Sequence, residues 1–190
     1  MASVRALRLH ATDAGVTSRL ESVSPEDLDS GDVTIRTAWS GINYKDALAV
    51  TGAGRIARKF PLVPGIDLAG VVTASRDTRY PAGARVLATG WGLGEHHDGG
   101  YADAARVSGD WLLPVPAAFD LRQAMLIGTA GFTAALALVR IEDTGQGPAA
   151  DPVLVTGASG GVGTFAVCLF ARAGYPVTAI TGKADAADRL

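Results

Sequence analysis

The 190-residue sequence has few of the side chains that form covalent cross-links or bind metals. Cys168 is its one cysteine, and it has three histidines. A single cysteine cannot form an internal disulfide or supply a cysteine cluster for zinc or iron. No apolar run reaches the roughly 18 residues of a membrane span, and residues 1–5 lack the apolar stretch of a signal peptide. We therefore expect a soluble, cytoplasmic protein with no membrane partner.

Charge of either sign is also scarce. The chain has 17 basic and 19 acidic residues, a formal net charge of −2 and a pI of about 5.9. Like charges form no run, so the sequence lacks the basic patch of a nucleic-acid-binding protein. Hydrophobic residues at 48% and charged residues at 19% are typical of a folded globular chain. A small molecule is therefore the expected partner, and nucleic acid is not.

The first 120 residues have the pattern of short β-strands separated by turns. Val33–Trp39 alternates apolar and polar residues after a turn at residues 30–32. We expect further strands at residues 6–9, 68–73, 85–89 and 100–107, separated by turn residues. Residues 1–120 therefore predict a β domain.

The pattern changes near residue 120. Asp120 can cap a helix over residues 121–125, and apolar residues at three- and four-residue steps predict a second helix over residues 128–139. After a loop come an apolar run at residues 152–156, a glycine turn, a helix over residues 161–173 and a second apolar run, Val177–Ile180. This order is a βαβ unit, which builds a parallel sheet. The predicted fold class is thus α/β plus β, with residues 121–190 beginning a doubly wound Rossmann domain.

The glycine turn at residues 156–163, TGASGGVG, matches the dinucleotide fingerprint with its first glycine replaced by Ala158. In that fingerprint Gly160 lets the backbone approach a pyrophosphate, Gly163 lets the helix pack closely, and the phosphates lie at the helix N-terminus. A glycine turn that serves packing alone is the alternative. The turn of short-chain dehydrogenases also matches, but in that family it lies near the N-terminus.

The end of the second strand indicates which dinucleotide binds. NAD sites usually carry an acidic residue there, whereas this chain has Thr181, Gly182 and Lys183. A hydroxyl and an ammonium suit a 2′-phosphate, so NADPH is favoured over NADH. Two alternatives stay open: Lys183 is simply a solvated residue at a helix start, and Asp185 is near enough to allow NADH.

Further segments match motifs of one known family at family spacing. They are residues 41–49 (GINYKDALA), 60–70 (FPLVPGIDLAG), 89–95 (TGWGLGE) and 127–134 (IGTAGFTA), together with the glycine turn. They resemble the zinc-independent medium-chain dehydrogenase/reductase superfamily, in its branch of acrylyl-CoA reductases and quinone oxidoreductases. The resemblance implies a GroES-like catalytic domain (1–120), then the start of an NADP-binding Rossmann domain (121–190), with the active cleft between them.

The same resemblance implies NADPH-dependent reduction of the carbon-carbon double bond of an α,β-unsaturated acyl-CoA, of the type acrylyl-CoA to propionyl-CoA. NADPH:quinone or enal oxidoreductase is the alternative. A second alternative is an inactive fragment that at most binds nucleotide, because only the first βαβ unit of a Rossmann domain is present. We expect the natural protein to continue past Leu190 and its full-length form to be a homodimer.

The resemblance also assigns site residues. Zinc members of the family carry a cysteine where this chain has Asn43, and they carry Gly-His-Glu where this chain has Gly-Ile-Asp at residues 65–67. Both ligand positions are changed, so no metal is expected. Asn43 and Tyr44 are the candidate catalytic donors to the developing enolate, and Tyr44 also contacts the cofactor; its alternative role is to pack an interdomain wall. Asp67 either orients its neighbours or caps a turn. The carried-over cofactor-binding residues are Tyr44, Ser159, Gly160, Gly161, Val162, Thr181, Gly182 and Lys183.

Overall fold

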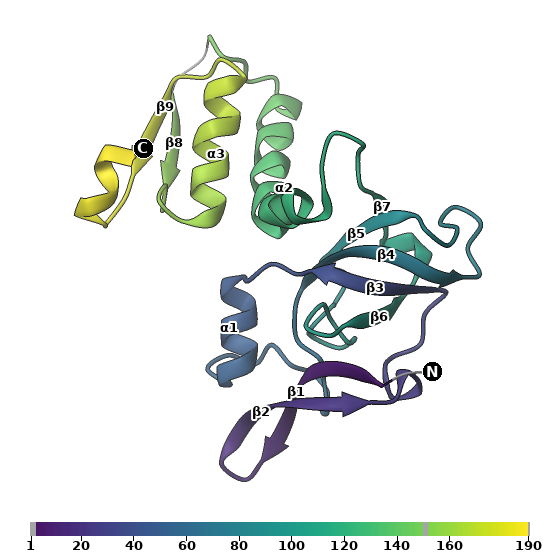
Figure 1. The fold of residues 1–190 in the computed structure, drawn as a ribbon. Coiled ribbons are helices and arrows are strands. Elements are labelled where there is room, and N and C mark those ends of the chain that lie inside the picture. The colour runs from purple at the N-terminus through teal and green to yellow at the C-terminus, as the bar shows by residue number, and fades with distance from the viewer. Residues whose placement is uncertain (1–2, 150–151, 190) are drawn as a thin grey trace. The chain divides into compact units, whose positions relative to one another are not determined.

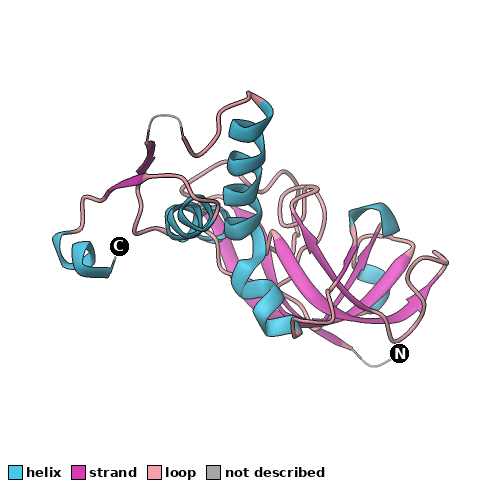
Figure 2. Cartoon of the chain, turned by 90° about the horizontal axis from the view of Figure 1, so that it is seen from above, coloured by secondary structure: helices cyan, strands magenta, loops and turns pink. Residues whose placement is uncertain are grey.

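The computed structural model describes residues 3–149 and 152–189 (Figure 1). The chain divides into two compact units, Met1–Thr129 and Ala130–Leu190. The expected fold class is confirmed: the first unit is mainly antiparallel β-sheet, and the second pairs two parallel strands with helices. Figure 2 marks the helices in cyan and the strands in magenta.

The first unit is built on a five-stranded antiparallel sheet with the order β6-β3-β4-β5-β7. Its strands are β3 (Val33–Trp39), β4 (Asp67–Ser75), β5 (Arg85–Thr89), β6 (Ala104–Val107) and β7 (Leu113–Pro114). Short 3-10 helices at Pro25–Asp27 and Gly109–Trp111 flank it. The apolar positions of β3, Val33 and Ile35, are fully buried in the core cluster, as their alternation predicts.

A separate hairpin precedes the sheet. β1 (Val4–Thr12) pairs antiparallel with β2 (Gly15–Val23), in a register from Val4↔Val23 to Thr12↔Gly15. Sequence analysis missed β2, because most of its residues are exposed or half-buried and give no clear alternation. Its one readable signal is the glycine that ends the turn, Gly15, at φ +115°.

Helix α1 (Tyr44–Thr51) was also missed. Asn43 is the N-cap residue of this helix, and its N–H donates to the Asp46 carboxylate 2.8 Å away. Gly52 ends the helix in the left-handed region at φ 69°. The helix has only eight residues, so its hydrophobic periodicity is too short to stand out.

Helix α2 (Leu121–Asp143) joins the two helices expected in this region. Asp120 caps its start as predicted: the Gln123 N–H donates to Asp120 Oδ1 at 2.7 Å. Gly128, at φ 44° and ψ −148°, interrupts the helix one residue before the first unit ends. Within the described residues, α2 is the one helix long and apolar enough to cross a membrane by length and composition, but this break divides it.

The second unit contains β8 (Val153–Thr156), α3 (Gly161–Arg172) and β9 (Val177–Ile180). The two strands pair in parallel from Val153↔Val177 to Thr156↔Ile180, so the predicted βαβ unit is confirmed. Its core includes Ala134, Val155 and Phe170, and Phe170 is 2% exposed. The final segment, Ala184–Arg189, is a 3-10 helix.

Candidate functional site

The first candidate pair, Asn43 and Tyr44, lies at the start of α1. Tyr44 is the first residue of the helix, and 80% of its side chain is exposed. Asn43 has extended backbone geometry and is half-buried. Because its N–H is held by Asp46 at 2.8 Å, the entry of the chain into the helix is fixed. Tyr44 therefore projects from a defined backbone position with its hydroxyl and ring accessible.

Asp67, the first residue of β4, is buried beside the loop that precedes α1, with 1% of its surface exposed. Its Oδ1 accepts the Gly41 N–H at 2.7 Å, and its Oδ2 accepts the Asn43 side-chain amide at 3.1 Å. The N–H and the hydroxyl of Thr129 also donate to Oδ2, each at 3.3 Å. One buried carboxylate thus binds the loop before α1 and the residue that follows the break in α2.

A second buried carboxylate, Asp46, accepts the backbone N–H of Asn43. It is 2% exposed and also accepts the Ile66 N–H at 2.9 Å. Burial raises the pKa of the Asp46 carboxyl above its usual value, and the nearby charge of Asp67 adds to the rise. Burial likewise raises the pKa of the Tyr101 phenol far above its usual range, and Tyr101 donates to the Gly41 carbonyl at 3.1 Å. Tyr101 is therefore a neutral donor that anchors the same loop.

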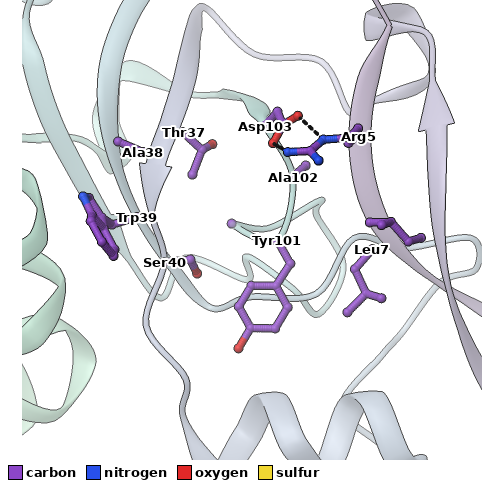
Figure 3. A pocket seen from close by; sticks show the side chains of 11 residues that line it. Arg5, Leu7, Thr37, Ala38, Trp39, Ser40, Tyr101, Ala102 and Asp103 are labelled. Carbon is purple, nitrogen blue, oxygen red and sulfur yellow. Dashed lines mark hydrogen bonds and ion pairs between the residues drawn. The ribbon is translucent and has the colours of Figure 1, made fainter.

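A hollow of about 340 Å³ opens beside this loop (Figure 3). Figure 3 shows the Arg5–Asp103 ion pair, 3.0 Å long, on one side of it, together with the ring of Tyr101. Ser40 also lines the hollow and donates to the Asp67 carbonyl at 2.7 Å. A second hollow, of about 520 Å³, is lined by residues of β3 and β4 that include Thr34 and Thr73. The lining of neither hollow includes Asn43, Tyr44 or Asp67. The hollow at Tyr101 thus shares Ser40 with the contacts of Asp67.

The glycine turn of the second unit has the geometry expected of a dinucleotide fingerprint. Gly157 adopts φ +61°, and Gly160 caps α3 in extended geometry. A Cβ at Gly163 would lie 2.2 Å from the Gly157 carbonyl oxygen, so the close packing predicted for this glycine is confirmed. The first N–H groups of a helix have no partner within the helix, and here Gly161 and Val162 provide them.

The structure brings the two predicted cofactor segments together. The Ser159 and Thr181 hydroxyls are 2.8 Å apart, although 22 positions separate them in sequence. Thr181 Oγ1 also accepts the Lys183 N–H at 3.1 Å, which shapes the turn after β9. Gly182 has open space where a Cβ would be. These residues and the N-terminus of α3 therefore form one group at the carboxyl ends of β8 and β9, where open α/β sheets bind ligands.

The described residues contain no group of three or more His, Cys, Asp or Glu side chains that could hold a metal ion. The pair Asp46 and Asp67 instead accepts hydrogen bonds from backbone and amide donors. Sequence analysis missed Asp46, Tyr101 and Thr129 as parts of the site. The spacing of Asn43 and Asp46 could have identified the helix start, but no local signal reveals that residues far apart in sequence converge on Asp67.

Comparison with known proteins finds sequence relatives among oxidoreductases. The alcohol dehydrogenase GroES-like domain family matches residues 29–117. Over 180 residues the chain is 51% identical to the probable acrylyl-CoA reductase AcuI of Escherichia coli, covering 95% of this chain and 56% of that protein. It is 47% identical over 186 residues to the putative quinone oxidoreductase YhfP of Bacillus subtilis, covering 98% of this chain and 56% of the relative.

Solved structures of similar proteins also match this chain. The YhdH oxidoreductase of Salmonella enterica in complex with NADP matches with a TM-score of 0.93 and 51% identity, over 96% of this chain and 56% of that one. Bacillus subtilis YhfP with NAD bound matches with a TM-score of 0.94 and 46% identity, over 99% of this chain and 57% of that one. Close structural relatives thus bind NADP or NAD. The chain spans about half the length of the curated relatives it matches.

Proposed function

Because this chain belongs to the medium-chain dehydrogenase/reductase superfamily, with a GroES-like domain, we propose that it forms part of an NADPH-dependent reductase. The substrate is the carbon-carbon double bond of an α,β-unsaturated acyl-CoA, of the type acrylyl-CoA to propionyl-CoA. The observation that carries the proposal is the Ser159–Thr181 hydroxyl pair beside the glycine turn, in a chain 51% identical to a probable acrylyl-CoA reductase. The proposed location is the cytoplasm.

The residues of the second unit fit a dinucleotide. The Gly161 and Val162 N–H groups at the start of α3 suit a pyrophosphate, and the absence of a side chain at Gly163 keeps the turn close to the helix. Ser159 and Thr181 offer hydroxyls to the phosphate and ribose. The Lys183 ammonium suits a 2′-phosphate, although it lacks the forked geometry of an arginine. When bound, the nicotinamide group supplies the hydride.

The residues of the first unit fit stabilisation of the substrate. Addition of hydride to the β-carbon of the double bond puts negative charge on the thioester oxygen. A preorganised hydrogen-bond donor beside that oxygen lowers the activation barrier. Tyr44 has an accessible hydroxyl, and Asn43 has a second amide proton besides the one that Asp67 accepts. We assign Tyr44 as the principal donor and cofactor contact, and Asn43 as the supporting donor.

Quinone or enal reduction is the second candidate, favoured by the 47% identity to the putative quinone oxidoreductase YhfP. Both reactions begin with the same hydride step, so the residues do not separate them. The structure of YhfP carries NAD, and the exposed Asp185 lies two positions after Lys183 in this chain. Relative use of NADPH and NADH is therefore a second variable in the test.

The experiment compares two polypeptides. One is the 190-residue chain, and the other is a longer form in which these residues are followed by the remaining C-terminal residues of the Escherichia coli relative. NADPH oxidation is followed with acrylyl-CoA and with a benzoquinone. The proposal expects the longer form to turn over acrylyl-CoA with a higher kcat/KM than the quinone. A preference for the quinone supports the second candidate, and NADPH binding without turnover of either substrate supports a role in nucleotide binding only.

A further inference from the structure

We propose that Asp67 is the positioning residue of the candidate site, holding Asn43 and the loop before α1 in the conformation that presents Tyr44. The inference deepens the proposed function and rests on it. Asp67 receives four hydrogen bonds: from the N–H of Gly41, the side chain of Asn43, and both the N–H and hydroxyl of Thr129. Oδ1 accepts one of these bonds and Oδ2 accepts the other three, so both oxygens of the carboxylate are engaged.

The donors around Asp67 are all neutral. In the part of the chain that the structure describes, none of the ion pairs involves Asp67. A buried carboxylate with no cation depends on its hydrogen-bond donors for stability, and such charge-assisted bonds are stronger than neutral ones. The segments that supply the donors are therefore drawn tightly to Asp67. This ties the conformation of the loop to the charge of a single side chain.

Two glycines allow the backbone to approach this carboxylate. A Cβ at Gly41 would lie 2.9 Å from both Asp67 oxygens, and one at Gly128 would lie 3.0 Å from Oδ2. Gly128 also has φ +44°, which a residue with a side chain adopts only with strain. Any larger residue at either position would push the carboxylate away. The glycines and Asp67 thus form one arrangement, in which the break in α2 places the Thr129 donors at Asp67.

The contact fixes the orientation of the Asn43 amide. Its nitrogen faces Asp67 Oδ2 at 3.1 Å, and the flipped amide would instead direct an oxygen at a negative charge. The Asn43 backbone N–H is held at the same time by Asp46, at 2.8 Å. Side chain and backbone of Asn43 are therefore both anchored to buried carboxylates. Because Tyr44 follows directly in the chain, its backbone position depends on these anchors.

The change D67N, compared with a matched control, distinguishes positioning of the loop before α1 from a general contribution of a buried carboxylate to stability. An asparagine keeps the shape but presents one acceptor oxygen, and its NH2 group faces donors where a carboxylate oxygen accepted them. The matched control is D98N, because Asp98 is also a buried carboxylate in the same unit, 6% exposed. Asp98 accepts the N–H groups of Asp29 at 3.0 Å and Val63 at 2.8 Å, and none of its hydrogen bonds in the described part of the chain involves Asn43 or Gly41.

The first measurement needs no activity: amide hydrogen exchange in the 190-residue chain. We expect D67N to speed exchange at Gly41, Asn43 and Thr129 by about tenfold, as loss of local hydrogen bonding does, with D98N leaving them within about threefold of wild type. Equal acceleration in both variants, or none in D67N, would overturn the inference. This result stands even where the longer form shows no turnover, so failure of the proposed function is distinguishable.

The second measurement uses the longer form with NADPH and acrylyl-CoA. Loss of positioning is expected to lower kcat about tenfold or more while the KM for NADPH stays within about threefold, because the cofactor residues are untouched. A fall in kcat that D98N reproduces would assign Asp67 a structural role only.

Discussion

Replacing Gly163 with alanine tests whether the glycine turn must lie against α3. The added Cβ would lie 2.2 Å from the Gly157 carbonyl oxygen and 2.7 Å from the Ala158 Cα, where ordinary contact begins at 3.4 Å. Overpacking costs about 1–3 kcal/mol, and the obstacle here is backbone, so the upper end applies. Alanine returns at most about 1 kcal/mol through its helix propensity. The expected net loss is about 2 kcal/mol of free energy of unfolding in the second unit.

The assay must report on the second unit alone. All three tryptophans lie in the first unit, at Trp39, Trp91 and Trp111, so tryptophan fluorescence does not serve. Amide hydrogen exchange in β8 and α3 does, and a loss of about 2 kcal/mol corresponds to roughly 30-fold faster exchange. NADPH affinity, measured by titration, is expected to fall in parallel.

The control for this prediction is Gly147→Ala, since a Cβ at Gly147 meets nothing within 4 Å in the same unit. It is expected to leave both the exchange rates and NADPH affinity unchanged. The reasoning is refuted if Gly163→Ala exchanges as slowly as wild type and binds NADPH equally well.

Three further predictions concern single side chains. Lys183→Ala is expected to raise the Kd for NADPH about fivefold, because one exposed charge contact of about 1 kcal/mol is lost. The Kd for NADH is expected to change little. An equal change in the Kd of both cofactors, measured in parallel titrations, would contradict the 2′-phosphate assignment. Tyr44→Phe is expected to lower kcat of the longer form about a hundredfold, since one donor to the developing charge is lost; an unchanged kcat with a higher KM for NADPH would instead favour a packing role. Because burial raises the pKa of Asp46, its neutral form is favoured on folding, and its contribution to stability is greatest at acid pH and declines as the pH rises through that raised pKa. Urea unfolding at several pH values should show the free energy of unfolding of wild type falling relative to that of Asp46→Asn as the pH rises, and a difference between the two that does not vary with pH would contradict it.

Local patterns were enough to predict the second unit. The strand, glycine turn, helix and second strand each have strong periodicity or turn chemistry, and β9 has the predicted bounds, Val177–Ile180. The link between Ser159 and Thr181 follows from the same topology, because parallel strands bring their carboxyl ends together. The sequence indicates this half of the candidate site because its contacts follow from one supersecondary unit.

The first unit shows what local patterns leave out. Strand β2 and helix α1 were missed because both are largely solvent-facing or short, so hydrophobic periodicity carries little information about them. Asp67 was identified as a residue that orients neighbours or caps a turn, and in the structure its carboxylate accepts hydrogen bonds from Gly41, Asn43 and Thr129. Its partner Thr129 lies 62 positions away, a distance over which no sequence spacing predicts contact.

The most direct test of the account measures products as well as cofactor. The longer form is incubated with NADPH and acrylyl-CoA, and NADPH consumed is compared with propionyl-CoA formed. The account predicts equal amounts of the two, no propionyl-CoA without NADPH, and a higher kcat/KM for acrylyl-CoA than for a benzoquinone. NADPH consumption with the quinone and no propionyl-CoA from acrylyl-CoA would contradict it.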